Sequence, residues 1–500
     1  MKKLYRFSAI ALLVLPLVFT SCSDYLDRDD DDNITEADVF ARYEKVNGLV
    51  SDVYAAAKKA DRPLVFFEHF SNSAITDECE GTNVEGNITN NFNNGAWNPN
   101  SLPGSVGQYW EALYEGIRKA NLIIENVQKY NTPDNPQQDG DLRNRIGEMY
   151  FMRGYFHMLL LRMYGEAPYI DRVINAGDNM DFKKESVHSM VEKIVTDAQT
   201  AYGMVPNKYV KTSENFGRVD KGACLGLISF VRWVAATPLW NGASQYGYNL
   251  RRVFENEYAY DATRWRKAKE AAKAVLDFEV GGTKRYSLYT KHDANDFKDP
   301  ADGNLNDSRV YARLWDMFYD MDAFANEYVF FMTKSKDQAW QGDIYPPSRE
   351  GSSRQQPVQE QVDEYEYIVG DYGYPVYSAE ARKGGYDDTN PYVKGTRDPR
   401  FYRDVIYHGA PYRNNKNESK TINTASGSDK IGATNATTTG YYLRKFQQES
   451  WNKSGNFSIN APAIWRLPEF IYIYAEACNE LGEDIDEAYK FCLLYTSDAA

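Results

Sequence analysis

Residue types that could catalyse a reaction are present in this chain, but their spacing matches no catalytic motif. No HExxH, GxSxG, P-loop, GxGxxG or CxxC pattern occurs. Acid pairs such as Asp77-Glu78 and Asp387-Asp388 could be glycosidase carboxylates, but that chemistry needs a defined separation, and acids in loops are usually solvated. The five histidines show no spacing typical of metal ligands: His69, His157, His188, His292 and His408. We therefore predict no enzymatic activity, and we expect neither a cofactor nor a metal.

A binding function has better support, because one tryptophan lies in a polar loop. Trp97 is part of the segment NNFNNGAWNPN, where no helical or strand pattern would bury it. Sugars offer a C–H face for stacking and hydroxyl groups at the ring edge, so a sugar site needs an exposed aromatic ring beside polar side chains. Trp97 is thus a candidate platform, with Asn93, Asn94 and Asn98 as edge partners. Alternatively, Trp97 only pins its loop to the body.

A second candidate platform lies in the segment KDQAWQGDIYPPS, which contains Trp340 and Tyr345. It follows an apparent strand, Tyr328 to Met332. Four other tryptophans lie on apolar helical patterns and are expected in the core: Trp110, Trp233, Trp265 and Trp465.

The N-terminus predicts export and a lipid anchor. Basic residues precede an apolar stretch, 9–19, which is shorter than the span of about 20 residues that a membrane helix needs but suits a signal peptide. Small residues then precede Cys22, which resembles a bacterial lipobox, so we expect residues 1–21 to be removed and Cys22 to be lipidated. The alternative is an ordinary signal peptide with a chance cysteine. The aspartates that follow predict a solvated tether over 22–34 rather than an EF-hand, because Asp32 occupies the position where that loop needs glycine.

Charge and length limit the possible partners. The chain has 57 basic and 71 acidic residues, a net charge of −14, and no basic cluster after the signal, so a nucleic-acid partner is not expected. About 480 residues would remain after cleavage, enough for a large core. The five cysteines form no CxxC pair, and Cys224 and Cys478 fit apolar helical patterns as small core residues.

Helical periodicity dominates the first half of the sequence and returns near the end. Apolar residues recur at i, i+3 and i+4, beside small residues, and predict successive helices that resemble tetratricopeptide pairs. The expected helices span 35–59, 110–124, 147–164, 187–202, 222–237, 265–276 and 464–481. Residues 71–109 and 281–462 are instead rich in Gly, Asn, Asp and Tyr, and within them 414–440 is expected to be mobile. The predicted fold class is mainly α: a tetratricopeptide-like scaffold of helix pairs with a large irregular, loop-rich region containing short strands.

Several segments, in this order, resemble the SusD/RagB family of Bacteroidetes outer-membrane nutrient-binding lipoproteins. They are WEALYEGIRKANLIIENV, GEMYFMRGYFHMLLLRMYGEAPYI, GRVDKGACLGLISFVRWVAATPLWN, QEQVDEYE, RDPRFYRDVIYHG, GYYLRKF and WRLPEFIYIYAEACNELG. The resemblance implies four tetratricopeptide-like helix pairs and an irregular region that carries the ligand surface. It also implies a SusC-like TonB-dependent transporter as partner, over which the protein closes like a lid. In such bacteria, a lipobox followed by acids resembles a signal for export to the cell surface.

Together these features predict a non-catalytic lipoprotein, attached to the outer membrane and exposed at the cell surface, that binds a glycan and delivers it to the transporter. The alternatives are capture of a peptide or glycopeptide, a surface glycoside hydrolase or protease, and a lid without ligand contacts. The expected division of the chain is: 1–21 signal peptide, 22–34 acidic tether, 35–280 helical scaffold with the ligand-loop insertion 71–109, 281–462 ligand-binding region and 463–491 closing helix.

The last residues, CLLYTSDAA, depart from the resemblance. The family continues past the AEA helix into another helix with an Arg-rich, Gly-containing motif, whereas this ending resembles sequencing-adapter read-through. We expect the native C-terminus to differ from this segment. A calcium ion among acids such as Asp302 to Asp307 has no support from their spacing.

Overall fold

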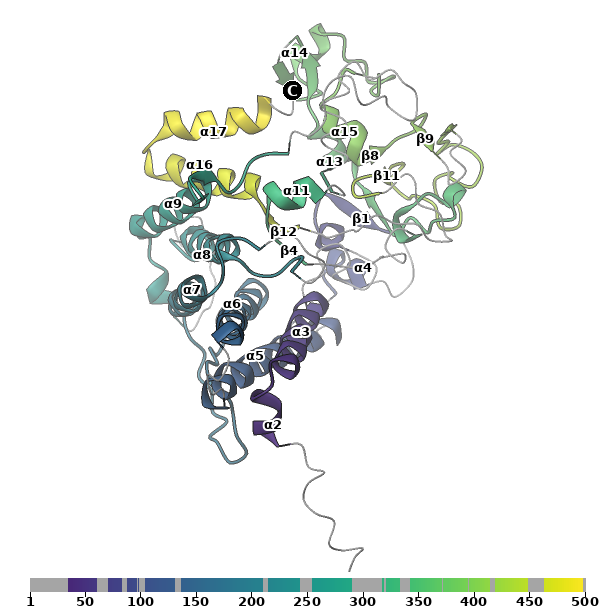
Figure 1. The fold of residues 1–500 in the computed structure, drawn as a ribbon. Helices are drawn as coiled ribbons and strands as arrows, with labels where there is room; N and C mark the ends of the chain where they lie inside the picture. The colour runs from purple at the N-terminus through teal and green to yellow at the C-terminus, as the bar shows by residue number, and fades with distance from the viewer. Residues whose placement is uncertain are drawn as a thin grey trace, which may run out of the picture.

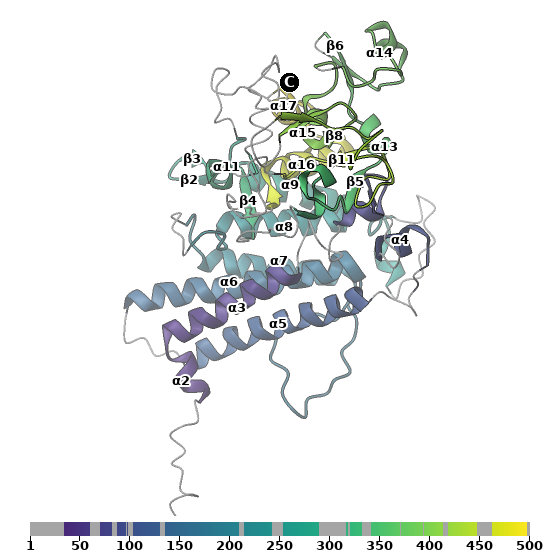
Figure 2. The same ribbon diagram turned by 90° about the vertical axis from the view of Figure 1, so that its right-hand side faces the viewer.

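A computed structural model describes most of the chain and shows a stack of helices beside a loop-rich region (Figure 1). In both views, α2 (Glu36–Phe40) and α14 (Ala379–Lys383) of the loop-rich region lie at opposite ends of the molecule (Figure 2). Cys22, Trp97, Trp340 and 302–307 lie outside the described residues. The described residues are 35–60, 71–82, 88–96, 98, 104–130, 136–209, 215–242, 254–289, 317–318, 321–332, 342–370, 372–393, 395–413, 419–447 and 463–497.

The scaffold consists of long helices that pack in succession. In the part of the chain that the structure describes, they are α3 (Tyr43–Ala60), α5 (Gly104–Tyr130), α6 (Pro136–Tyr164), α7 (Val187–Met204), α8 (Lys221–Ala236), α9 (Ala262–Leu276), α16 (Leu467–Leu481) and α17 (Ile485–Ser497). Each packs on the next, and α16 lies beside α9 although it is far away in sequence (Figure 1). This arrangement confirms the predicted tetratricopeptide-like scaffold, including the place of the helix predicted at 464–481, which is α16.

The helices begin and end where their residues require it. Asp220 caps α8 by accepting a hydrogen bond from the backbone N–H of Ala223, and Ser186 caps α7 in the same way through Ser189. The helix α6 ends at Gly165, whose φ is +70° and whose Cβ, if it had one, would lie 2.8 Å from the ring of Trp240. Only glycine suits both the left-handed backbone and this close ring.

Several helix boundaries differ from the sequence prediction. The helices predicted at 110–124 and 147–164 are longer, as α5 and α6, and two other differences have a local cause. The helix expected from Thr35 is divided: Thr35 and Asp38 form the predicted capping box of α2 (Glu36–Phe40), and the chain then turns before α3. This turn allows Phe40 to be buried where α2 meets α5. The last predicted helix starts at Leu467 rather than Ile464, because the preceding residues pair as a strand and Pro468 fits only a first helical turn.

The loop-rich region contains short antiparallel strand pairs, as predicted, and short helices. The pairs are β1 (Cys79–Gly81) with β5 (Gln355–Pro357), β2 (Glu279–Val280) with β3 (Thr283–Lys284), β4 (Tyr328–Phe331) with β12 (Ala463–Arg466), β6 (Tyr367–Val369) with β7 (Tyr372–Tyr374), β8 (Val405–Ile406) with β11 (Tyr442–Leu443), and β9 (Pro411–Arg413) with β10 (Ser419–Thr421). The short helices are η3 (Asn72–Ile75), α4 (Ile88–Asn93), η5 (Glu255–Tyr258), α11 (Met321–Asn326), η6 (Pro347–Arg349), α13 (Gln359–Asp363), α14 (Ala379–Lys383) and α15 (Pro399–Asp404).

Two strand pairs connect the parts of the molecule. The pair β4–β12 joins the loop-rich region to the scaffold, where Phe330 and Trp465 pack against Tyr155 of α6. The pair β1–β5 joins the first predicted ligand loop to the second. The two regions that sequence composition assigns to ligand binding are therefore in contact.

The polar stretch 414–440 is not loosely attached where the structure describes it. The hydroxyl of Thr437 donates to Oε1 of Gln356 at 3.1 Å, and the hydroxyl of Tyr442 donates to the carbonyl of Asp429 at 2.8 Å. Thr437 is fully buried. Hydrogen bonds to distant residues thus anchor 419–440 in place of apolar side chains, whereas the mobility expected for 414–440 stays a prediction.

No helix within the described ranges combines the length and the apolar character that a membrane span requires.

His157 of α6 is a structural histidine. It is fully buried, its Nδ1 lies 2.8 Å from the carbonyl of Arg153, and its Nε2 accepts a hydrogen bond from the backbone N–H of Ile170 at 3.0 Å. Nδ1 therefore carries the proton of a neutral ring. Burial lowers the pKa of His157 to about 3, because the imidazolium cannot be solvated there.

We expect this histidine to make the protein less stable in mild acid. The unfolded chain binds a proton at His157 below about pH 6.5 whereas the folded chain does not, so stability is lost as pH falls from 6.5 towards 3. The expected loss at pH 5 is about 2 kcal/mol. Urea unfolding of the parent and of His157→Gln between pH 7 and pH 5 measures it. The variant should show a shallower pH dependence, and identical slopes would contradict the assignment.

Candidate functional site

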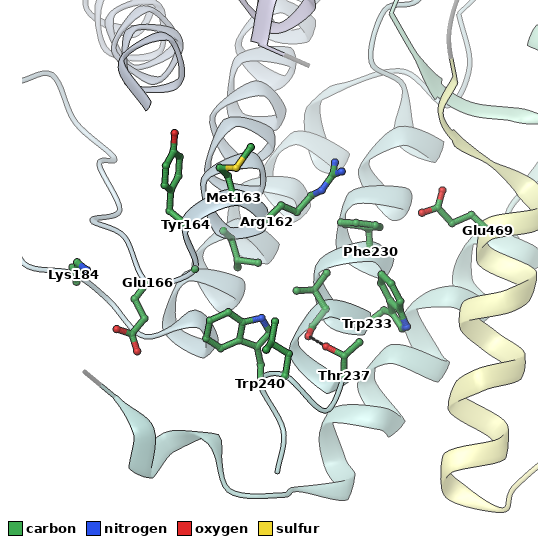
Figure 3. Close-up of a pocket in the computed structure, with 14 residues that line it drawn as sticks. Arg162, Met163, Tyr164, Glu166, Lys184, Phe230, Trp233, Thr237, Trp240 and Glu469 are labelled. Atoms are coloured by element: carbon green, nitrogen blue, oxygen red, sulfur yellow. Dashed lines mark hydrogen bonds between the residues drawn. The ribbon is translucent and has the colours of Figure 1, made fainter. Parts of the chain in front are cut away.

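One cavity among the described residues belongs to the helical scaffold. It has a volume of about 820 Å³ and lies between the ends of α6 and α8 and the start of α16. Figure 3 shows Lys184 and Glu166 at one end, Glu469 at the other, and Trp233 and Trp240 between them. Burial raises the pKa of Glu469 to about 7, although nearby arginines oppose this shift.

The polar groups of the scaffold cavity mostly serve the fold. Trp233 donates its indole N–H to Glu476 at 2.7 Å, and Glu166 accepts a hydrogen bond from the hydroxyl of Tyr258 at 2.9 Å. Trp240 packs over Gly165. This cavity contains none of the residues from the predicted ligand loops.

Another, smaller cavity among the described residues lies where the two predicted ligand loops meet. Its volume is about 420 Å³, within the usual range for small-molecule sites. One wall comes from η3 and β1, and the other from β5, α13, the end of α15 and the residues after β11. We call it the loop cavity. Its polar lining includes Ser73, Glu78, Gln361, Asp404 and Lys445, and its apolar lining includes Phe446.

Two oppositely charged residues determine the electrostatics of the loop cavity. Asp404 is held by its neighbour Arg403 and by the hydroxyl of Tyr365 at 2.9 Å. Burial alone would raise the pKa of Asp404, but Arg403 and Lys445 keep it below its ordinary value. Burial lowers the pKa of Lys445, and the attraction of Asp404 only partly opposes this. Asp404 is therefore a buried anion that already accepts hydrogen bonds from Arg403 and Tyr365.

The described lining suits binding better than catalysis. Burial raises the pKa of the Cys79 thiol to about 12, so a nucleophilic thiolate is not populated at neutral pH. Asp404 is fully engaged and is not a free acid or base. What remains is a mixture of hydrogen-bonding groups, one ammonium group and an aromatic side chain, which can orient a polar ligand.

The predicted site residues fall in different places. Asn93 and Asn98 are exposed, and the side-chain amide of Asn93 donates to the carbonyl of Ala74 at 3.2 Å, which fastens α4 to η3 beside the loop cavity. Trp97, Trp340 and Cys22 lie outside the described residues. The assignment of these residues to a ligand or lipid stays a prediction.

Tyr345 requires a correction. Its side chain is 0% exposed and belongs to an apolar cluster with Val362, Phe401 and Ile406. A ring that is covered on both faces cannot stack on a sugar, so we no longer consider Tyr345 a platform. The partners that bury it lie at least 17 residues away in sequence, and local pattern could not reveal them.

Other polar residues of the loop-rich region serve the fold. Arg397 is structural, since its guanidinium donates to the carbonyls of Tyr365 at 2.8 Å and Val362 at 2.6 Å. Asp387 accepts hydrogen bonds from Thr389, and Asp388 pairs with Arg382 at 2.9 Å, so both acids serve their own loop. By contrast, sequence reasoning missed Gln361, Lys445 and Phe446. The only signal was their presence in the quoted segments QEQVDEYE and GYYLRKF.

Comparisons with known proteins agree with this architecture. A family model described as "Starch-binding associating with outer membrane" matches residues 24–231, and one described as "SusD family" matches residues 320–491. SusD-like protein P2 of Formosa agariphila is 24% identical over 202 residues, which cover 40% of this chain and 38% of that protein.

Solved structures share the fold at low sequence identity. A SusD-like protein from Bacteroides fragilis matches with a TM-score of 0.70 and 18% identity, over 94% of this chain and 81% of its own. A SusD homologue from Bacteroides thetaiotaomicron matches with a TM-score of 0.60 and 17% identity, over 93% of this chain and 79% of its own. A laminarin-binding SusD-like protein matches with a TM-score of 0.54 and 16% identity, over 91% of this chain and 84% of its own. These similarities support the fold alone.

Proposed function

We propose, from the premise that this chain belongs to the SusD/RagB family, that it is a non-catalytic protein of the bacterial cell surface that captures a glycan. The observation that carries the proposal is the loop cavity, where the two predicted ligand loops meet on a rigid helical scaffold. Binding sites are commonly built in this way, on loops that a stable body positions.

The chemistry of the loop cavity fits a sugar. Hydroxyl groups at the edge of a sugar ring need both donors and acceptors, which Ser73, Gln361 and Glu78 supply. The apolar face of the ring needs a flat partner, which Phe446 and the predicted platforms Trp97 and Trp340 could supply. A structural neighbour supports this direction, because a SusD-like protein of the same fold binds laminarin.

Delivery and location are part of the same proposal. Lipidation at Cys22 would attach the protein to the outer membrane, and the acidic tether would let the scaffold turn towards its partner. A SusC-like TonB-dependent transporter would receive the glycan, with the protein above it as a lid. The curated relative is matched over only 38% of its length, so its activity and partners are not carried over directly.

Affinity gel electrophoresis against plant, host and microbial polysaccharides tests the proposal. The chain from Ser23 onward should be retarded by one polymer, and Trp97→Ala combined with Trp340→Ala should weaken binding about tenfold or more, since each stacked ring is worth about 1 kcal/mol. Tyr372→Ala is a suitable control, because this ring is 70% exposed on the distant hairpin β6–β7.

Three outcomes distinguish the functions that the sequence analysis left open. Retardation that the double variant abolishes supports glycan capture through the platforms. Release of products from a labelled polymer would instead show an enzyme. Binding of peptides, with no retardation by any polymer, would replace the glycan by a peptide ligand.

A further inference from the structure

Lys445 is one of the residues that line the loop cavity. It follows β11 directly, and its backbone N–H donates to the carbonyl of Asp404 at 3.2 Å, which fixes the start of the side chain. Its Nζ lies 5.3 Å from the centre of the Phe446 ring. Among the residues that the structure describes, none accepts a hydrogen bond from this Nζ, and no carboxylate lies within 4.0 Å of it.

The backbone next to Lys445 is held in an unusual conformation. Phe446 has a φ of +65°, which a bulky side chain rarely adopts and which costs about 1–3 kcal/mol. The turn is secured by a hydrogen bond of 3.0 Å from the backbone N–H of Gln447 to the carbonyl of Arg444, and by the side chain of Gln447. The consequence is that consecutive side chains, Lys445 and Phe446, both line the cavity.

The anionic groups near Lys445 do not fully balance its positive charge. Asp404, a buried anion that lines the same cavity, is already bound by Arg403 and Tyr365. Arg466 adds another positive charge nearby, although Glu327 neutralises it through a hydrogen bond of 2.8 Å. Glu78 is exposed to solvent, where its attraction is screened. Burial lowers the pKa of Lys445, and Arg403 and Arg466 lower it further, while Asp404 and Glu78 oppose the shift only in part.

We propose that the loop cavity recognises an anionic sugar, whose acidic group pairs with Lys445. This proposal rests on glycan capture and specifies the class of glycan. A uronate carboxylate or a sulfate ester would accept charge-assisted hydrogen bonds from Nζ, which are shorter and stronger than neutral ones. The hydroxyl groups of the same sugar would meet Ser73 and Gln361, and Phe446 would cover its apolar face.

A matched set of probes tests the anion directly. Binding is measured for oligogalacturonate, for its methyl ester, for a sulfated galactan oligosaccharide and for neutral laminarin oligosaccharides. We expect the parent protein to bind at least one acidic probe about tenfold more tightly than the neutral probes, with an affinity that falls as salt is added. The methyl ester keeps the sugar chain of oligogalacturonate but removes its negative charge, so it tests the effect of the charge alone. The sulfated probe tests whether a sulfate ester is bound as well as a carboxylate.

Variants at Lys445 show whether this side chain is responsible. Lys445→Met should remove the preference for the acidic probe, whereas Lys445→Arg should keep much of it. Both substitutions preserve a long apolar stem, and unchanged thermal unfolding would verify that the cavity is still folded. The control is Lys119→Met, on an exposed pair of α5 at 2.8 Å from Glu115, which should leave the preference unchanged.

The outcomes separate this proposal from the one on which it rests. Binding of neutral glycans with no acidic preference would overturn the anionic ligand and leave glycan capture intact. An acidic preference that Lys445→Met does not alter would place the anion elsewhere and overturn the role of Lys445. Binding of none of these glycans, nor of any polysaccharide in the gel assay, would overturn both.

Discussion

Replacing Glu148 with glutamine is expected to lower the free energy of unfolding by about 3–5 kcal/mol, because it removes a buried charge that pairs with both Arg145 and Arg218. Glu148 of α6 is 0% exposed. Its carboxylate accepts hydrogen bonds from Arg145 at 2.5 Å and Arg218 at 2.8 Å, and from the hydroxyl groups of Tyr54 at 3.0 Å and Tyr209 at 2.7 Å. An amide cannot replace this arrangement, since one of its two polar groups is a donor that would face other donors.

The size of this effect follows from the position of the network. Its members come from α3, from α6 and from the segment that leads into α8, so the carboxylate joins three parts of the scaffold. An intact buried ion pair adds little net stability, but a buried charge that has lost its partner is costly. The loss should therefore affect the whole scaffold and not only one helix.

Urea unfolding followed by circular dichroism measures the effect. The matched control is Glu115→Gln on α5, whose pair with Lys119 has side chains that are 63% and 41% exposed, respectively. Surface pairs contribute about 0–1 kcal/mol, so the control should unfold at nearly the parent concentration of urea. If Glu148→Gln lowered the free energy of unfolding by less than about 1 kcal/mol, water or a rearrangement would be replacing the lost hydrogen bonds to Arg145 and Arg218.

The scaffold could be predicted from sequence because its signals are local. The i, i+3, i+4 pattern of α7 corresponds to a buried face of Val187, Met190, Val191, Ile194 and Ala198. The capping box at Thr35 is equally local, because its two residues are only three positions apart. Where a feature depends on neighbours in the chain, the sequence suffices.

The candidate site could be predicted only as a region, because its details depend on distant contacts. Composition placed ligand loops at 71–109 and 281–462, and the loop cavity draws its walls from both. No local pattern shows that Tyr345 is buried or that Lys445 lines the cavity. The position of Lys445 depends on the hydrogen bond to the carbonyl of Asp404 and on the left-handed backbone at Phe446. Neither feature can be recognised from the adjacent residues in the sequence.

Replacing Trp465 with alanine is expected to lower the free energy of unfolding by about 3–5 kcal/mol, as removal of a large buried side chain usually does. Trp465 of β12 is 2% exposed. Its ring centroid lies 5.9 Å from that of Tyr155, 5.8 Å from that of Phe230 and 5.7 Å from that of Phe330. These rings belong to α6, α8 and β4, so the cavity left behind would lie where the strand pair β4–β12 meets the scaffold.

Because β4–β12 joins the loop-rich region to the helices, this variant should also weaken glycan binding without touching the loop cavity. Thermal unfolding and affinity electrophoresis of Trp465→Ala measure the two effects. Trp465→Phe should retain most of the stability, since a ring still fills the site. Tyr372→Ala removes an aromatic ring that is 70% exposed and should change the stability by less than about 0.5 kcal/mol. If Trp465→Ala were as stable as this surface variant, the strand pair would not be what fastens the loop-rich region to the scaffold.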